Sequence, residues 1–215
     1  MKDIPPPLDD LLYVQSWVKP RVSPKRYGHI IGVARSAKDL ATRFNPNPKK
    51  IDQEFVYLAE LAGWLHDACK EMEDKTLIEQ AKKYGLKLHP VEEKNGHLLH
   101  GPVAAQLVKH EFGLQHQDLL NAIAEHTLGA IAMTHLSKIV FLADAIEPGR
   151  ASEYADPIRE PLKSTSINDR ISPLDKAVLI ACESSLQFLA QTGKVIHPRT
   201  IEVRDYYLKI CQSKV

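Results

Sequence analysis

Three features are scarce in this chain of 215 residues: cysteine, net charge and long apolar runs. The cysteines, Cys69, Cys182 and Cys211, are odd in number and widely spaced, which fits neither a disulfide framework nor a four-thiolate zinc site. The net charge of +1 provides no overall field to draw the chain to nucleic acid or an anionic membrane. Its longest apolar stretch, residues 139–143, is far too short to span a bilayer. We therefore expect a soluble cytoplasmic protein with neither nucleic acid nor membrane among its partners.

What the chain does have is apolar side chains at the three-and-four spacing of amphipathic helices. Between residues 27 and 44 they recur at Tyr27, Ile30, Ile31, Ala34, Ala37, Leu40, Ala41 and Phe44. Similar patterns, with prolines, glycines and capping residues at their ends, predict helices near residues 9–18, 23–44, 52–67, 74–84, 100–112, 117–127, 133–146, 172–193 and 198–211. No alternating strand pattern competes with them, so we predict an all-α, single-domain fold.

The segments outside these helices have their own expectations. Residues 1–8 are interpreted as an N-terminal tail ahead of a domain that covers residues 9–215. Residues 86–98 are long enough to act as a lid over a site, although plain connection is an equal alternative. Two prolines, Pro157 and Pro161, leave room for only short helices within residues 151–171.

Six polar residues sit in or beside these helices, and several project toward an apolar side: His29, His66, Asp67, His100, His126 and Asp144. His126, for example, follows Leu119 by seven positions and Ile123 by three. A buried carboxylate or imidazole needs a partner, and divalent cations would satisfy these groups together. Spacing alone does not select this set. His110 fits as well, three residues after Leu107, and a lone histidine on an apolar face is more often a hydrogen-bonded core residue.

The family context of five ordered sequence blocks selects the six. The blocks are residues 26–33 (RYGHIIGV), 66–70 (HDACK), 99–105 (LHGPVAA), 125–129 (EHTLG) and 143–150 (ADAIEPGR). On them the chain resembles the HD-domain metal-dependent phosphohydrolases, and within these the YqeK-like family of symmetrical diadenosine tetraphosphate hydrolases. An isolated His-Asp pair would be weak evidence, because such pairs occur by chance in many proteins. Five blocks in order are far more specific.

The resemblance implies an HD-domain helical bundle with a dinuclear metal site in its interior. The metal-site core would cover residues 23–150, and C-terminal helices would follow over residues 172–211. The two divalent ions would be iron, with manganese or another divalent ion as a substitute. Carried over block by block, their ligands are His29, His66, Asp67, His100, His126 and Asp144, with Asp67 bridging the two ions. Leu128 and Ala145 stand where the family usually has threonine and tyrosine, and neither is a proposed ligand.

The block around Asp67 also contains a candidate catalytic cation. Lys70 follows His66 by four residues, so it lies on the side of the site if the helix continues for one more turn. Its charge would then steady a phosphate oxygen in the transition state, which makes Asp67 and Lys70 the candidate catalytic residues. A solvated surface lysine is the alternative. Cys69, between them, is better explained as a small buried filler than as a reactive thiol.

Arg26, Thr127 and Arg150 join Lys70 as candidates for substrate binding. Arg150 follows a Pro-Gly turn that could bring its planar guanidinium onto a distal phosphate, and pairing with Glu147 or Glu153 is an equal alternative. Arg26 lies three residues before the first ligand histidine, on the same helical face. The hydroxyl of Thr127 would orient a ligand, touch substrate or cap a helix.

We expect a nucleotide partner and a hydrolytic reaction. A metal-activated hydroxide would attack an inner phosphorus of a dinucleoside polyphosphate, so that diadenosine tetraphosphate and water give two ADP. The reaction type rests on the chemistry of the residues together with the HD-domain resemblance, whereas the substrate rests on the narrower family resemblance alone. Two alternatives stay open: an HD phosphohydrolase of other nucleotides or phosphate esters, and a non-catalytic, metal-loaded nucleotide-binding regulatory module. Whether the chain forms a homodimer is also left open.

Overall fold

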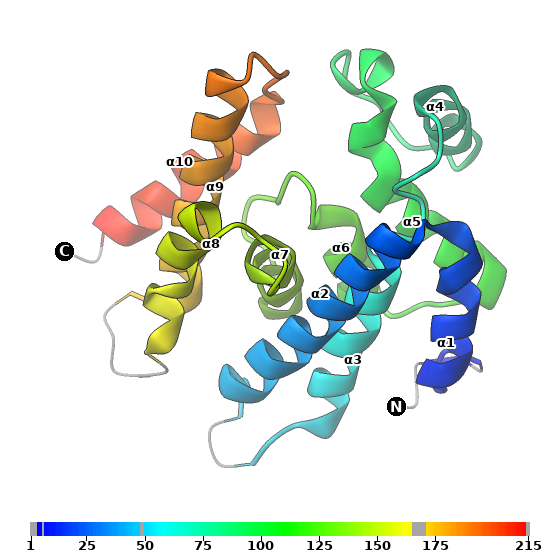
Figure 1. Cartoon of the computed structure of the whole chain (residues 1–215), viewed down its shortest axis with the longest axis horizontal. Helices are drawn as coiled ribbons and strands as arrows, with labels where there is room; N and C mark the ends of the chain where they lie inside the picture. The colour runs from blue at the N-terminus through cyan, green and yellow to red at the C-terminus, as the bar shows by residue number, and fades with distance from the viewer. Residues whose placement is uncertain (1–3, 6, 48–49, 165–170, 214–215) are drawn as a thin grey trace.

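The computed structural model describes residues 4–5, 7–47, 50–164 and 171–213 (Figure 1). Over these residues it contains helices and no β-strand, which confirms the predicted all-α fold. The α-helices are α1 (Leu11–Val18), α2 (Pro24–Arg43), α3 (Gln53–Leu65), α4 (Asp74–Lys83), α5 (His100–Phe112), α6 (Gln117–Glu125), α7 (His135–Ile146), α8 (Ser152–Arg159), α9 (Pro173–Gln191) and α10 (Pro198–Gln212). Short 3-10 helices lie between them: η1 (Lys19–Arg21), η2 (Glu92–Lys94), η3 (Gly96–Leu99) and η4 (Pro161–Lys163).

Helix α7 lies at the centre of the fold. Figure 1 shows it nearly end-on, between α2 and α3 on one side and α8 to α10 on the other. It packs against α2, α3, α6, α8 and α9. Most of its side chains are buried, among them Leu136, Ile139 and Leu142, because its sequence is apolar around most of the helix circumference. The one carboxylate of this helix, Asp144, is thereby placed in the middle of the molecule.

Helices α2 and α3 cross in direct backbone contact at Gly63. A Cβ atom built on Gly63 would lie 2.6 Å from the Cα atom of Ala34, so only glycine allows this approach. The close crossing brings His29, on α2, beside His66, at the C-terminal end of α3. Their ring centroids are 5.7 Å apart.

Helix α3 ends earlier than the sequence indicates. Its last residue is Leu65, and the chain then turns tightly, with the amide of Ala68 donating to the carbonyl of Leu65 (3.2 Å). The amide of Lys70 donates in the same way to the carbonyl of Asp67 (3.0 Å). The helix therefore does not continue for a further turn to Lys70, which was the condition set for this residue to lie on the side of the site.

The segments that flank the helices are also packed. Leu8, in the segment interpreted as a tail, is fully buried, and the hydroxyl of Tyr57 on α3 donates to its carbonyl (2.5 Å). Residues 1–3 and 6 of that segment lie outside the described residues. Between residues 151 and 164 the helices are short, as the prolines predict, and residues 165–170 are again outside the description. In the part of the chain that the structure describes, no helix has the length and apolarity needed to cross a membrane.

The α2–α3 crossing gives a stability test. Gly63→Ala should lower the free energy of unfolding by about 1–3 kcal/mol, because the new methyl group overlaps the backbone of α2. Gly28→Ala, in an exposed part of α2 with no atom within 4 Å of the added Cβ, should instead stabilise by roughly 0.5–1 kcal/mol. Urea unfolding of the chelator-treated proteins measures both changes. Equal effects of the two substitutions would show that the crossing does not depend on a missing side chain.

Candidate metal centre

The ends of several helices bring the six candidate ligands into one place. His66 and His126 follow the last residues of α3 and α6, and His100 is the first residue of α5. The other three are His29 on α2, Asp67 in the turn after α3 and Asp144 on α7. His66, Asp67, His100 and His126 are at most 3 % exposed. The six residues predicted from the sequence therefore share one largely buried site.

Main-chain carbonyls orient three of the four imidazoles. In each of these, the ring Nδ1 atom lies close to the carbonyl oxygen three residues earlier: His66 to Gly63 (2.7 Å), His100 to His97 (2.5 Å) and His126 to Ile123 (2.8 Å). Carbonyls near helix ends lack an intrahelical partner, so they are free to accept. Because a carbonyl only accepts, each Nδ1 carries the hydrogen, and the neutral ring keeps a lone pair on Nε2. The three Nε2 atoms are thus fixed as the available donors of electron pairs.

A carboxylate orients the fourth imidazole. Nδ1 of His29 lies 3.1 Å from Oε1 of Glu147, and Oε2 of the same carboxylate accepts from the amide of Gly149 (2.6 Å). Glu147 is buried, and its carboxylate fits because two neighbouring residues are glycines without a side chain. A Cβ on Gly32 would lie 2.6 Å from Oε2, and one on Gly149 would lie 2.9 Å from Oε1. From the sequence, Glu147 was expected only as part of the block at residues 143–150 or as a partner of Arg150, and its place beside His29 depends on space that Gly32 leaves open.

The two oxygens of Asp67 face different imidazoles. Oδ1 lies 3.2 Å from Nε2 of His100 and 3.5 Å from Nε2 of His126. Oδ2 lies 3.6 Å from Nε2 of His66 and 3.7 Å from Nε2 of His29. A carboxylate placed in this way can coordinate two neighbouring cations, one through each oxygen.

The donor atoms are close enough together to hold a metal ion. Those of His29, His66 and Asp144 lie within 4.8 Å of one another, as do those of His66, Asp67 and His126. Nε2 of His66 is buried and has no hydrogen-bond partner among the described residues. An unpartnered buried nitrogen is rare in proteins and fits a group that coordinates a ligand. Imidazole nitrogens and carboxylate oxygens together suit a divalent transition metal.

The electrostatics keep His66 and His100 neutral and the two carboxylates charged. Burial lowers the pKa of His66 and of His100 to about 4. Burial alone would raise the pKa of Asp67, but the surrounding imidazoles, led by His66, hold it well below its ordinary value. The pKa of Asp144 is also lowered against the effect of burial, by its contact with His29 and by the charge of Arg150. These are the protonation states that metal coordination requires.

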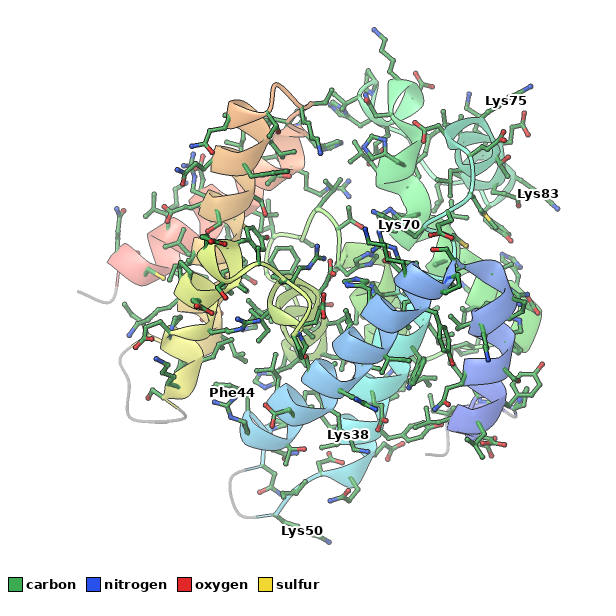
Figure 2. The ribbon with its side chains drawn as sticks, in the orientation of Figure 1. Lys38, Phe44, Lys50, Lys70, Lys75 and Lys83 are labelled. Carbon is green, nitrogen blue, oxygen red and sulfur yellow. The ribbon has the colours of Figure 1, made fainter. Side chains whose placement is uncertain are left out.

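Lys70 and Thr127 reach the same centre from its open side. Nζ of Lys70 lies 3.4 Å from Nε2 of His100, and burial lowers the pKa of this lysine. Figure 2 shows Lys70 near the middle of the view, whereas Lys75 and Lys83 extend outward at the edge. The hydroxyl of Thr127 lies 3.0 Å from Nε2 of His100. Although α3 stops short of Lys70, the tight turn still brings its side chain to the site.

Both candidate arginines contact carboxylates of the centre. Nη1 of Arg26 lies 3.0 Å from Oδ2 of Asp67. Nη2 of Arg150 lies 2.5 Å from Oδ1 of Asp144, and its Nε donates to the Asp144 carbonyl (2.8 Å). Arg150 therefore pairs with the candidate ligand itself. Cys69 is fully buried, and burial raises the pKa of its thiol to about 12, which fits the expected filler.

Comparisons with known proteins place this site in a family. Residues 26–149 match the model of the HD domain, a span that contains all six candidate ligands. The chain belongs to the HD-domain family.

Two curated relatives and one solved structure resemble most of the chain. A relative in Staphylococcus aureus is 32 % identical over 189 residues, which is 88 % of this chain and 90 % of that protein. One in Bacillus subtilis is 33 % identical over 183 residues, or 85 % of this chain and 89 % of that protein. Both are named symmetrical bis(5'-nucleosyl)-tetraphosphatase. The crystal structure of a predicted HD superfamily hydrolase involved in NAD metabolism, from Clostridium acetobutylicum, has a TM-score of 0.79 and 31 % identity, and the match covers 93 % of this chain and 97 % of that one.

The contact between Glu147 and His29 predicts a metal-affinity defect. Glu147→Gln keeps the shape of the side chain but removes its charge, so it should weaken metal affinity by roughly 10- to 100-fold. Competition with a chelator, followed by metal analysis, measures this change. Glu153→Gln, an exposed residue on α8, is the matched control and should retain full affinity. Unchanged affinity in Glu147→Gln would rule out the orienting role.

Proposed function

We propose that this protein is a metal-dependent hydrolase that cleaves dinucleoside polyphosphates symmetrically, converting diadenosine tetraphosphate and water into two ADP. Membership of the HD-domain family and the names of the relatives in Staphylococcus aureus and Bacillus subtilis support this proposal. The observation that carries it is the placement of Asp67, whose two oxygens face separate pairs of imidazoles.

The proposed metal ligands are the six residues predicted from the sequence, and Asp67 would bridge two divalent ions. The ions would be iron, with manganese or another divalent ion as a substitute. Bound there, they would lower the pKa of a water molecule and offset the negative charge of a polyphosphate. The convergent Nε2 atoms of His66, His100 and His126 support this assignment, because each imidazole is already fixed in the orientation that coordination needs.

The remaining residues act on the phosphate chain. In the reaction, the water oxygen loses a proton to solvent and forms a bond to one inner phosphorus. The bond from that phosphorus to the oxygen it shares with the other inner phosphorus breaks, and ADP leaves with the electron pair. Lys70 and Thr127, both within 3.4 Å of Nε2 of His100, are placed to steady an oxygen of the attacked phosphate. Arg26 and Arg150 hold the two carboxylates of the centre and place positive charge beside the polyphosphate.

Product analysis with metal analysis tests the function. Protein purified without added metal should contain close to two divalent ions per chain, and it should convert diadenosine tetraphosphate to ADP as the sole nucleotide product. Asp67→Ala should lose metal and ADP release while keeping its helical circular dichroism. Activity on phosphate monoesters alone, or wild-type turnover by Asp67→Ala, would contradict the proposal.

Lys70→Ala should separate charge stabilisation from metal binding. The variant should keep its metal content and lose kcat by about 100-fold, because a buried cation at the reacting phosphate acts mainly in the transition state. Lys75→Ala removes a lysine whose side chain is 85 % exposed and should turn over like the wild type. Loss of metal from Lys70→Ala would assign this residue to the integrity of the centre instead.

A further inference from the structure

A cavity of about 820 Å³ adjoins the metal centre and extends to the C-terminal helices. Lys70, Thr127 and Arg150 line it, and their contacts with His100 and Asp144 mark the part nearest the metal ligands. Its lining also includes the last turn of α9 and residues 193–195, which follow that helix. A volume of this size suits a nucleotide better than a single phosphate group.

The C-terminal part of the lining presents apolar surface to solvent. Phe188 on α9 is 49 % exposed, and Val195 is 48 % exposed. Half-exposed large apolar side chains inside a cavity leave hydrated surface that a flat apolar ligand would cover. Lys194 stands beside them, with its Nζ atom 5.0 Å from the centroid of the Phe188 ring. An exposed aromatic ring next to a cation is a chemistry that binds nucleobases.

Polar contacts hold the walls of this cavity in place. The hydroxyls of Tyr154 on α8 and Ser185 on α9 are 3.1 Å apart. Behind His197, which also lines the cavity, Oε1 of Glu92 lies 3.5 Å from Nε2 of this histidine, and both residues are buried. The second contact joins residues 86–98 to the start of α10. These contacts tie the segments that line the cavity to one another.

We propose that this cavity binds one nucleoside of the polyphosphate substrate. The base packs against Phe188 and Val195, and the phosphate chain passes Arg150 and Thr127 to reach the metal centre. This proposal rests on the proposed function, and it deepens it by assigning the recognition of the base. Residues 188–195 lie beyond residues 26–149, the span that matches the HD domain. The C-terminal helices would then decide which group attached to a phosphate chain is accepted.

Binding of ADP and of inorganic pyrophosphate to the metal-loaded protein tests the assignment. Phe188→Ala should weaken ADP binding and raise KM for diadenosine tetraphosphate by about tenfold each, because one stacking surface is lost. Pyrophosphate affinity and metal content should stay at wild-type values, since pyrophosphate has no base and Phe188 touches no candidate ligand. Phe188→Trp should restore ADP affinity. Tyr13→Ala removes an aromatic residue of similar exposure, 40 %, on α1 and away from the cavity lining, and should change none of these quantities.

Two outcomes would overturn the base-binding role: wild-type ADP affinity in Phe188→Ala, or an equal loss of ADP and pyrophosphate binding. The readouts also separate this proposal from the proposed function. If ADP binding depends on Phe188 but diadenosine tetraphosphate is left intact, the nucleoside site stands and the hydrolase proposal fails. If the tetraphosphate is cleaved and Phe188→Ala behaves as the wild type, the hydrolase proposal stands and the nucleoside site fails.

Discussion

The orientation of four imidazoles is the constraint on which the rest of this structure depends. A neutral imidazole coordinates a cation through the nitrogen that lacks the hydrogen, and the condition that favours this is a partner that accepts from the other nitrogen and holds the ring in place. Three rings meet this condition through main-chain carbonyls near helix ends, and His29 meets it through Glu147. The positions at which these helices begin and end therefore determine whether the carbonyls reach the rings. Their lengths and crossings, including the contact of α2 with α3 at Gly63, serve the meeting of these rings.

The charges of the centre are arranged around two carboxylates. Asp67 and Asp144 stay ionised in a buried place because imidazoles and guanidinium groups surround them. Arg26 and Arg150 each pair with one of these carboxylates, and Lys70 approaches from the same open side. Three cationic side chains thus lie beside the candidate ligands. This explains how a chain with a net charge of only +1 can present a site suited to polyphosphate.

The sequence predicts the helices and the six convergent residues, because helical spacing and ordered motifs are local in the chain. The role of Glu147 was not predictable in the same way, since it depends on space that Gly32, far away in the sequence, leaves open. The tight turn that brings Lys70 to the site was not predicted, because apolar spacing does not reveal a turn after Leu65. The place of Phe188 in a cavity wall was not predictable from the sequence either, because the role of an exposed aromatic residue on a helix depends on its neighbours in space.

The use of main-chain carbonyls to hold His66, His100 and His126 affects how the site tolerates sequence drift. A peptide carbonyl is present whatever residue occupies a position, so neutral changes around these three histidines leave the orienting bond intact as long as the helix end persists. The orientation of His29 is not protected in this way, because its orienting group is the side chain of Glu147, which one nucleotide change can replace. Robustness to mutation is thus uneven across the four rings, and the orientation of His29 is the one most easily lost through substitution of a neighbouring residue.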